Sequence, residues 1–507
     1  MKKFVQFFSF AAMTQVILLL NQVVLLPLQI RLWGNKETAL WYAAIALATA
    51  TTVADLGLRT AGHVELLRLV RSNDPVAEKE FAHLWAWIRL LVLVFTATLL
   101  IGDLVYRLWH GPGNAFGHGW ALGRALLTLA YAFETILTIR IVYLDSLGEY
   151  SRAESSYFAF AAMRMALAVP AVLVFKIHFI GLCWLFFATS VLGLILQGWL
   201  CDIPRQLQLF RPVPGNLSLR TCFLARYTLA EPCANWFRLS LPVLVIAAIA
   251  PPATVTTFVA LRAIYGAGRQ TIQQVARVAS VEVLRFRATG RSETGESLLS
   301  FFLMATALIG TLMACLVSLD NLRILGLWLK HFDRHLFQNV NLSFGLSSSF
   351  YSYQVLVALS FRVGQLATMA RRQYAYILYS AAFAAAALTA KSLIAYLSLL
   401  VIAEMALSIS FVTQQNIGRE PGYKTKAGRR GLAGSFSGAL LVLAIWMSVR
   451  HASTDFFLRN SALTALQTAC LLAIGIGLLL LLEGAANAGM LRSLRTSLRQ
   501  SATTVNV

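Results

Sequence analysis

Several apolar segments of this 507-residue chain contain ionisable side chains at helical spacing. These side chains are the candidates for binding a ligand or transferring a proton. In one segment Thr52, Asp55, Arg59 and His63 follow at steps of three, four and four residues. Residues at these steps share one helix face, and an acid and a base one turn apart can pair. Asp55 and Arg59 are therefore predicted to pair, either as a structural pair near a membrane surface or within a ligand site.

Similar polar residues occur in other apolar segments, with more arginine than acid at depth. A charge at the middle of a bilayer costs about 2.5–3.5 kcal/mol, so these side chains should face one another or a wet interior. Guanidinium groups bind phosphate through two donors at once, which predicts a phosphate or diphosphate ligand. The candidate ligand-binding residues are Arg59, Arg262, Arg238, Arg164, Arg89, Asn21, Gln22 and Tyr265. The candidates for ion or proton coupling are Asp55, Glu134 and Glu231.

Two alternatives remain open for these residues. The amides of Gln15, Gln22, Gln29 and Asn235 could hold helices together through interhelical hydrogen bonds instead of lining a pathway. Side chains near the ends of the segments, such as Arg269, could reach the lipid headgroups. No catalytic constellation is evident, so the chain is expected not to be an enzyme, and neither a metal nor a cofactor is expected.

The segments that must position these residues are membrane spans. The chain is 58% hydrophobic and 13% charged, with a mean hydropathy of +0.68, which predicts an all-α polytopic membrane protein. The net charge of +21 is attributed to basic cytoplasmic loops and anionic lipids, not to nucleic acid. The six cysteines show no metal or disulfide spacing.

Fourteen apolar stretches qualify as spans. They lie near 8–32, 38–67, 82–109, 121–146, 155–176, 178–201, 225–249, 254–280, 298–320, 340–367, 374–390, 392–414, 432–449 and 462–483. The predicted organisation is two pseudo-symmetric six-helix lobes around a central cavity, plus two C-terminal helices. Its parts are an N-terminal lobe 1–202, a cytoplasmic linker 203–224, a C-terminal lobe 225–415, a basic loop 416–431, the last two spans 432–484 and a basic tail 485–507.

Basic residues concentrate in alternate loops, and this predicts that both termini lie in the cytoplasm. The two predicted lobes also share a weak sequence similarity. Asn21 precedes Pro27 by six residues in the first span, and Asn235 precedes Pro242 by seven in the seventh.

The stretch TALWYAAIALATATTVADLGLR carries an aromatic pair, Trp41–Tyr42, and the motif DLGLR. With the seventh and eighth spans and the divided 14-span plan, it resembles the polysaccharide-transporter (Wzx-type flippase) branch of the multidrug/oligosaccharidyl-lipid/polysaccharide (MOP) exporter superfamily. The resemblance implies a flippase in the bacterial cytoplasmic (inner) membrane. Such a flippase moves polyprenyl-diphosphate-linked oligosaccharide to the periplasmic leaflet for O-antigen, capsule or exopolysaccharide synthesis.

The resemblance also implies alternating access around a central cationic cavity, and it carries over to Arg59, Arg262 and Arg238 in this chain. Membrane lipids, a polysaccharide polymerase and glycosyltransferases are the implied partners. The first span departs from the pattern, because it has Asn21 and Gln22 where a mid-membrane arginine is expected.

Two rival functions remain. An ion-coupled multidrug exporter of the same superfamily would be expected to have 12 spans and a deep carboxylate in the first. A membrane oligosaccharide polymerase or ligase would be expected to have a long outer loop, whereas the candidate loop here, 321–341, is short.

Overall fold

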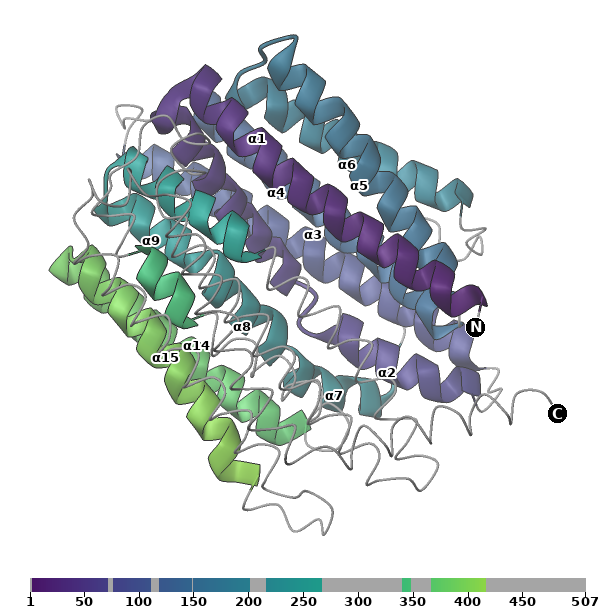
Figure 1. The fold of residues 1–507 in the computed structure, drawn as a ribbon. Helices are drawn as coiled ribbons and strands as arrows, with labels where there is room; N and C mark the ends of the chain where they lie inside the picture. The colour runs from purple at the N-terminus through teal and green to yellow at the C-terminus, as the bar shows by residue number, and fades with distance from the viewer. Residues whose placement is uncertain are drawn as a thin grey trace, which may run out of the picture. The chain divides into compact units, whose positions relative to one another are not determined.

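The computed structural model describes residues 2–71, 76–110, 118–147, 149–200, 216–266, 340–347 and 366–415 (Figure 1). These residues fall into two compact units, with 2–264 and 366–396 in the first and 265–266, 340–347 and 397–415 in the second. The predicted spans 298–320, 432–449 and 462–483, the basic loop and the tail lie outside the described residues.

Every regular element in the described part of the chain is helical, which confirms the all-α class. The helices are α1 (Lys2–Ala48), η1 (Thr49–Val53), α2 (Leu58–Arg71), α3 (Val76–His110), α4 (His118–Ser146), α5 (Tyr150–Leu173), α6 (Phe179–Leu200), α7 (Leu219–Thr228), α8 (Ala230–Leu239), α9 (Leu241–Ile249), α14 (Leu366–Ala390) and α15 (Leu393–Gln415). Residues 252–266 and 340–347 are also helical.

Five stretches among these helices are long and apolar enough to cross a membrane, and the bent pair Val24–Val53 and Leu58–Leu66 makes a sixth if it is one span. The five are Val76–Val105, Gly119–Val142, Arg152–Leu173, Phe179–Gln197 and Leu219–Ile249. The protein is therefore a multi-pass membrane protein. The count of fourteen stays a prediction, because several spans lie outside the described residues.

The predicted second span, 38–67, is not one helix. α1 kinks at Gly34 (φ +78°), where the first two predicted spans meet, and the helix is interrupted between Val53 and Leu58. The hydroxyls of Thr49, Thr51 and Thr52 each donate to the carbonyl three residues earlier, and such bonds compete with regular α-helix.

The motif DLGLR forms the turn at this interruption. Leu56 (φ +49°) and Gly57 (φ +76°) are left-handed, and Asp55 Oδ1 accepts the amide of Gly57 at 3.0 Å. A Cβ on Gly57 would lie 2.7 Å from the carbonyl oxygen of Ala225 on α7. Both the positive φ and this close approach require glycine.

The predicted seventh span, 225–249, begins earlier and is divided. α7 begins at Leu219, and Ser218 caps it by accepting the amide of Thr221 at 3.1 Å. The helix is interrupted at Leu229 and again at Ser240. Pro232 and Pro242 follow these interruptions, and each lacks the amide that would extend the preceding helix. Pro27, by contrast, lies inside α1, where the helix continues through it. The similar Asn–Pro spacing in the two segments therefore does not correspond to a similar backbone.

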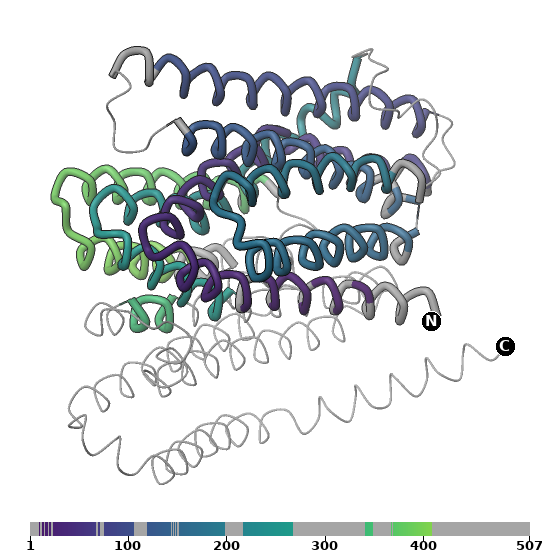
Figure 2. Tube along the Cα trace, turned by 90° about the horizontal axis from the view of Figure 1, so that it is seen from above, coloured from purple at the N-terminus to yellow at the C-terminus, as the bar shows by residue number. Residues whose placement is uncertain are grey.

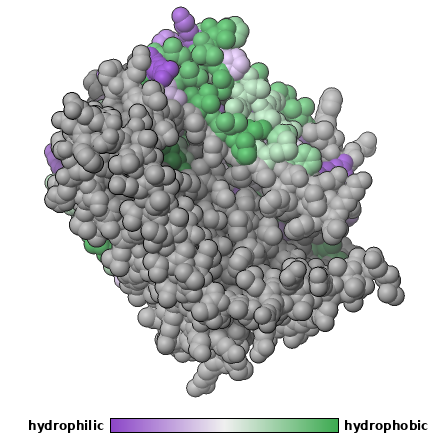
Figure 3. Space-filling model, viewed as in Figure 1, coloured by the Kyte–Doolittle hydropathy of each residue, from purple (hydrophilic) through white to green (hydrophobic). Residues whose placement is uncertain are grey.

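The long helices of the first unit run alongside one another (Figure 1, Figure 2). α1 packs mainly on α5, and α4 packs mainly on α6. The outer faces of α5 and α6 are apolar and exposed, for example at Leu167 and Trp184. Figure 3 shows apolar surface over this part of the molecule, as a helix facing lipid requires.

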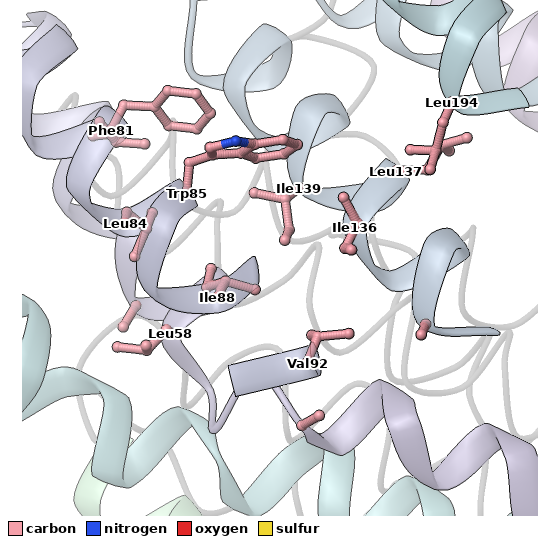
Figure 4. Close-up of a cluster of buried hydrophobic side chains, with 14 of the residues drawn as sticks. Leu58, Phe81, Leu84, Trp85, Ile88, Val92, Ile136, Leu137, Ile139 and Leu194 are labelled. Atoms are coloured by element: carbon pink, nitrogen blue, oxygen red, sulfur yellow. The ribbon is translucent and has the colours of Figure 1, made fainter. Parts of the chain in front are cut away.

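Two apolar clusters form the interior of this unit. The first includes Trp85, Ile88, Ile136, Phe160 and Leu194, from α3 to α6 (Figure 4). The second includes Leu25, Trp41, Ala130, Ala168 and Phe186. Trp41 is 1% exposed and contacts Phe186 edge-to-face at 5.1 Å. Trp41 is therefore a core residue. It does not lie at a membrane interface or on a surface where it could stack on a sugar, as tryptophans in membrane proteins can.

Candidate functional site

A polar layer lies between the two apolar clusters. On α5, Arg164 comes one turn after Phe160 of the first cluster and one turn before Ala168 of the second. On α6, Ser190 lies in the same way between Leu194 and Phe186. The helix period therefore places these polar side chains at one level of the bundle.

Arg164 is fully engaged within this layer. Its Nη1 lies 2.5 Å from Glu134 Oε1 of α4. Nη2 donates to Ser190 Oγ at 2.7 Å, and Nε donates to Thr189 Oγ1 at 3.3 Å. The rings of Phe160 and Phe186 lie against its guanidinium group, each at 4.6 Å.

The geometry of α6 explains why these two hydroxyls accept. Thr189 and Ser190 both donate their protons to the carbonyl of Phe186, at 2.9 Å. Their lone pairs are therefore left for Arg164. The side chain of Arg164 is 10% exposed and that of Glu134 is 21% exposed. Arg164 is thus held in place as a support for Glu134, and Glu134 is the more accessible member of the pair.

Asp55 and Arg59 form the predicted ion pair, with Nε to Oδ2 at 3.3 Å. Arg59 Nη1 also donates to Thr138 Oγ1 on α4 at 2.9 Å. Thr138 donates its own proton to the carbonyl of Thr135. Asp55 is 1% exposed, whereas the side chain of Arg59 is 27% exposed. The turn at DLGLR therefore places the partly accessible Arg59 against the face of α4 that also carries Glu134.

Three tyrosines complete the layer: Tyr42 of α1, Tyr131 of α4 and Tyr157 of α5. Tyr42 and Tyr131 pack against the second apolar cluster and Tyr157 packs against the first. The side chains of all three keep some accessible surface. Tyr131 lies three residues before Glu134 on α4, and Tyr157 lies seven residues before Arg164 on α5. Each tyrosine therefore shares a helix face with one member of the ion pair. No hydrogen bond joins the three hydroxyls to any other residue that the structure describes. Polar groups that are partly buried, keep some accessible surface and have no hydrogen-bond partner in the protein are suited to bind a ligand.

Arg262 lies on the helix at 252–266. Its charge acts on the hydroxyls of Tyr42 and Tyr131, and its side chain is partly exposed. Thr256 anchors the helix by donating to Asn35 Oδ1 at 3.0 Å. We call Arg59, Arg164, Arg262, Asp55, Glu134, Tyr42, Tyr131 and Tyr157 the polar layer.

Arg238 and Glu231 lie on α8, which the structure places beside α14. The Arg238 guanidinium stacks on the buried ring of Tyr376 at 4.7 Å. Trp236, two residues earlier, faces α1 and donates to the carbonyl of Ala46 at 3.1 Å. Arg238 therefore points away from α1, and its contact is with α14. Glu231 is partly buried in the first turn of α8.

The remaining predicted residues are scattered. Arg89 is partly buried on α3, next to Ile88 of the first cluster. Asn21 Oδ1 is buried and has no hydrogen-bond partner among the described residues. The side chain of Gln22 lies outside the description.

Tyr265 belongs to the second unit and is 1% exposed. Its hydroxyl donates to Asn341 Oδ1 at 2.8 Å, and its ring stacks on Phe344 at 5.5 Å. In this structure Tyr265 therefore joins two helices and has no surface open to a ligand.

A separate cavity of about 420 Å³ lies between α3 and α4, with Leu47 of α1 on its wall. An ion pair of Arg124 with Asp103 lines it, and Arg124 stacks on Trp120 at 4.2 Å. None of its lining residues belongs to the polar layer. In the described part of the chain, no group of three His, Cys, Asp or Glu residues could hold a metal ion.

The sequence matches no known protein family, and no curated protein matches it. Solved structures with the same fold do match. The lipid II flippase MurJ in an inward closed conformation has a TM-score of 0.63 at 13% identity, and the match covers 96% of this chain and 99% of the MurJ chain. A eukaryotic MATE transporter has a TM-score of 0.55 at 11% identity, covering 86% and 99%. An inward-facing multidrug resistance MATE family transporter of the MOP superfamily has a TM-score of 0.52 at 12% identity, covering 86% and 96%.

These matches show that the chain shares its fold with these membrane transporters. At such low identity the likeness concerns the fold alone.

Proposed function

We propose that the chain is a flippase that moves polyprenyl-diphosphate-linked oligosaccharide across the bacterial cytoplasmic membrane by alternating access. One observation carries the proposal. Three arginines, and three tyrosine hydroxyls that have no hydrogen-bond partner among the described residues, lie in a polar layer between two apolar clusters. Such a layer is costly within a membrane and is expected only where a polar ligand passes.

Arg262 is the proposed primary phosphate ligand. It is partly exposed, and the groups on which its charge acts include two neutral phenols, Tyr42 and Tyr131. Phenol hydroxyls can donate to phosphate oxygens, while arginine supplies paired donors and charge. Arg59, also partly exposed, is the proposed second ligand, because its contact with Thr138 leaves other donors of its guanidinium available.

Arg164 has a different proposed role. Glu134, two hydroxyls and two rings already occupy it, so it positions Glu134 and does not bind phosphate itself. Asp55 and Glu134 remain the candidates for ion or proton coupling. Arg238, which stacks on Tyr376 of α14, remains a secondary candidate, as do Glu231 and Arg89.

The likeness to MurJ supports a lipid-linked substrate over a drug. The MurJ match covers more of this chain, at a higher TM-score, than the MATE transporter matches. In the proposed orientation, with both termini in the cytoplasm, a diphosphate moves outward from the negative side. The membrane potential then favours transport by about 2.3 kcal/mol per charge per 100 mV.

Alternating access requires the helices to move, and the interrupted helices are the places where they can bend. The break at Gly57 contacts the break between α7 and α8, and Thr228 donates to the Gly57 carbonyl at 2.7 Å. We propose this contact as a pivot between the lobes 1–202 and 225–415, joined by the linker 203–224. The motion is rocking of the two lobes about the pivot, as in other inverted or repeated transporter folds.

Flipping can be measured with the purified chain in proteoliposomes that contain a fluorescent polyprenyl-diphosphate oligosaccharide. The proposal predicts that an impermeant quencher reaches the lipid faster than in protein-free liposomes. Transport of cationic dyes without lipid flipping would instead indicate a drug exporter. Lengthening of the sugar chain in the presence of acceptor would indicate a polymerase.

A further inference from the structure

We propose that the cavity between α3 and α4 binds a membrane phospholipid with a zwitterionic phosphoethanolamine head group, and that the ion pair of Arg124 with Asp103 recognises this head group. The guanidinium group binds the phosphate, and the carboxylate binds the ammonium group. None of the residues that line the cavity belongs to the polar layer, so the inference does not depend on the transported substrate.

The charged pair lies near one end of the two helices that form the cavity. The apolar span of α3 ends at Val105, two residues after Asp103, and that of α4 begins at Gly119, five residues before Arg124. At a rise of about 1.5 Å per residue, both side chains begin within about 8 Å of the end of their span. This is the level at which the hydrocarbon meets the lipid head groups. In the proposed orientation, with both termini in the cytoplasm, this end is periplasmic.

The cavity can be reached from the lipid side of the bundle. α3 lies at the edge of the first unit (Figure 2), and only 17% of its apolar window is buried. Gly102 on the cavity wall is exposed, and a Cβ added there would meet nothing within 4 Å. Ile101 and Leu104, on either side of Gly102 and Asp103, are 59% and 56% exposed. A lipid can therefore place its head group in the cavity and its acyl chains against these apolar side chains.

The ion pair is the charged part of a cavity with mainly apolar walls, such as those formed by Leu47 and Leu99. It joins Nη2 of Arg124 to Oδ1 of Asp103, and the guanidinium group stacks on Trp120 at 4.2 Å. The side chains of Arg124 and Asp103 are 15% and 20% exposed, so a ligand can contact both. The volume of about 420 Å³ is typical of a site for a small ligand group. Ionisable side chains within a membrane span are rare, and they commonly mark the place of a polar ligand.

A zwitterionic head group is complementary to this pair. Arginine carries several N–H donors and a carboxylate has several acceptor positions, so each can bind a further group while the ion pair is kept. The guanidinium group donates to phosphate oxygens, and a primary ammonium group donates to Asp103. A phosphatidylglycerol head group brings no cation for Asp103. A choline head group has no N–H to donate, and Arg124 already covers the ring of Trp120 that could attract it.

Lipid binding can be measured by native mass spectrometry on the full-length chain in detergent, after removal of co-purified lipid. Three lipids with the same acyl chains are compared: phosphatidylethanolamine, phosphatidylglycerol and phosphatidylcholine. We expect phosphatidylethanolamine to bind about tenfold more tightly than the other two, as one added charge-assisted hydrogen bond would provide.

Asp103→Asn is the decisive variant, because it removes the negative charge and keeps the size of the side chain. It should abolish the preference for phosphatidylethanolamine and make phosphatidylglycerol the tightest ligand, since Arg124 then lacks a counter-charge. A purely structural ion pair would change stability but not the order of the lipids. Glu149→Gln, at the exposed ion pair with Arg152, is the matched control and should keep the wild-type order.

Arg124→Gln is the second variant, and it decides the result if Asp103→Asn does not fold. It removes the phosphate ligand and should weaken the binding of all three lipids about tenfold. Thermal unfolding checks that each variant is folded.

Equal affinity of the wild-type chain for the three lipids, or no saturable binding of phosphatidylethanolamine, would overturn the zwitterionic class of the ligand. An unchanged order of the lipids in folded Asp103→Asn, or unchanged binding in folded Arg124→Gln, would overturn the site itself. The flipping assay tests the proposed function separately, so failure of this site would leave that function standing.

Discussion

Arg164 Nη1 and Glu134 Oε1 lie 2.5 Å apart between two apolar clusters of the bundle. The two residues come from neighbouring helices, α5 and α4, and are 30 positions apart in the sequence. Each would be costly in this environment without the other. The pair therefore fixes how these helices face each other, and it orients the carboxylate that the polar layer exposes.

Removing one partner of this pair should be more damaging than removing both. Arg164→Met removes the ion-pair partner of the partly exposed Glu134 carboxylate, and we expect it to destabilise the protein by about 1–3 kcal/mol. Adding Glu134→Gln should recover much of this loss. Thermal unfolding in detergent measures both. Equal stability of the single and double variants would contradict the structural role of the pair.

Gly57→Ala should impair folding or transport far more than other glycine substitutions. The new methyl group meets the backbone of Ala225 and Leu229, and alanine is strained at φ +76°. Gly34→Ala has the same strain (φ +78°) but nothing within 4 Å of the new Cβ, so it should cost only about 1–2 kcal/mol. Gly102→Ala has neither problem. Unfolding temperatures and flipping rates should rank the three variants in this order.

Thr138→Val should weaken transport without removing any charge. Valine has the shape of threonine but cannot accept the hydrogen bond from Arg59 Nη1. Arg59 would then be held by Asp55 alone, and we expect a severalfold lower flipping rate. Thr98→Val is the control, because its hydroxyl is bonded to its own helix at an exposed position. If both variants transport equally well, Thr138 does not position Arg59.

Tyr265→Phe should leave substrate affinity unchanged. The hydroxyl is committed to Asn341 in the second unit, so its loss should cost about 0.5–1.5 kcal/mol of stability and no binding. Binding of farnesyl diphosphate together with thermal unfolding checks this. A large fall in affinity with unchanged stability would restore Tyr265 as a ligand.

Helical periodicity was enough to predict the Asp55–Arg59 pair, because both residues lie on one short segment. It could not predict that the segment turns at Leu56 and Gly57. The reason is that this turn depends on contact with α7, which is more than 160 residues away in the sequence. Tyr131, Glu134 and Thr138 follow at steps of three and four, so their spacing alone places them on one face of α4. Local spacing could not identify the partner of Arg164, because Glu134 is on another helix.

Tyr157 was not among the predicted residues, although a signal was present. It lies seven residues before Arg164, hence on nearly the same helix face. Ser190 and Thr189 carried no such signal, since α6 has no charge to mark its polar side. Tyr265 shows the opposite case: it was predicted to bind the ligand, but in this structure packing on Phe344 and Asn341 encloses it.

The binding of farnesyl diphosphate to Arg262 variants in nanodiscs tests the central claim most directly. Arg262→Gln removes the charge of the proposed phosphate ligand, and Arg152→Gln removes an arginine at an exposed ion pair with Glu149. The account predicts that Arg262→Gln lowers the affinity about tenfold or more, and that Arg152→Gln leaves it at the wild-type value. Wild-type affinity in folded Arg262→Gln protein would contradict a phosphate site in the polar layer.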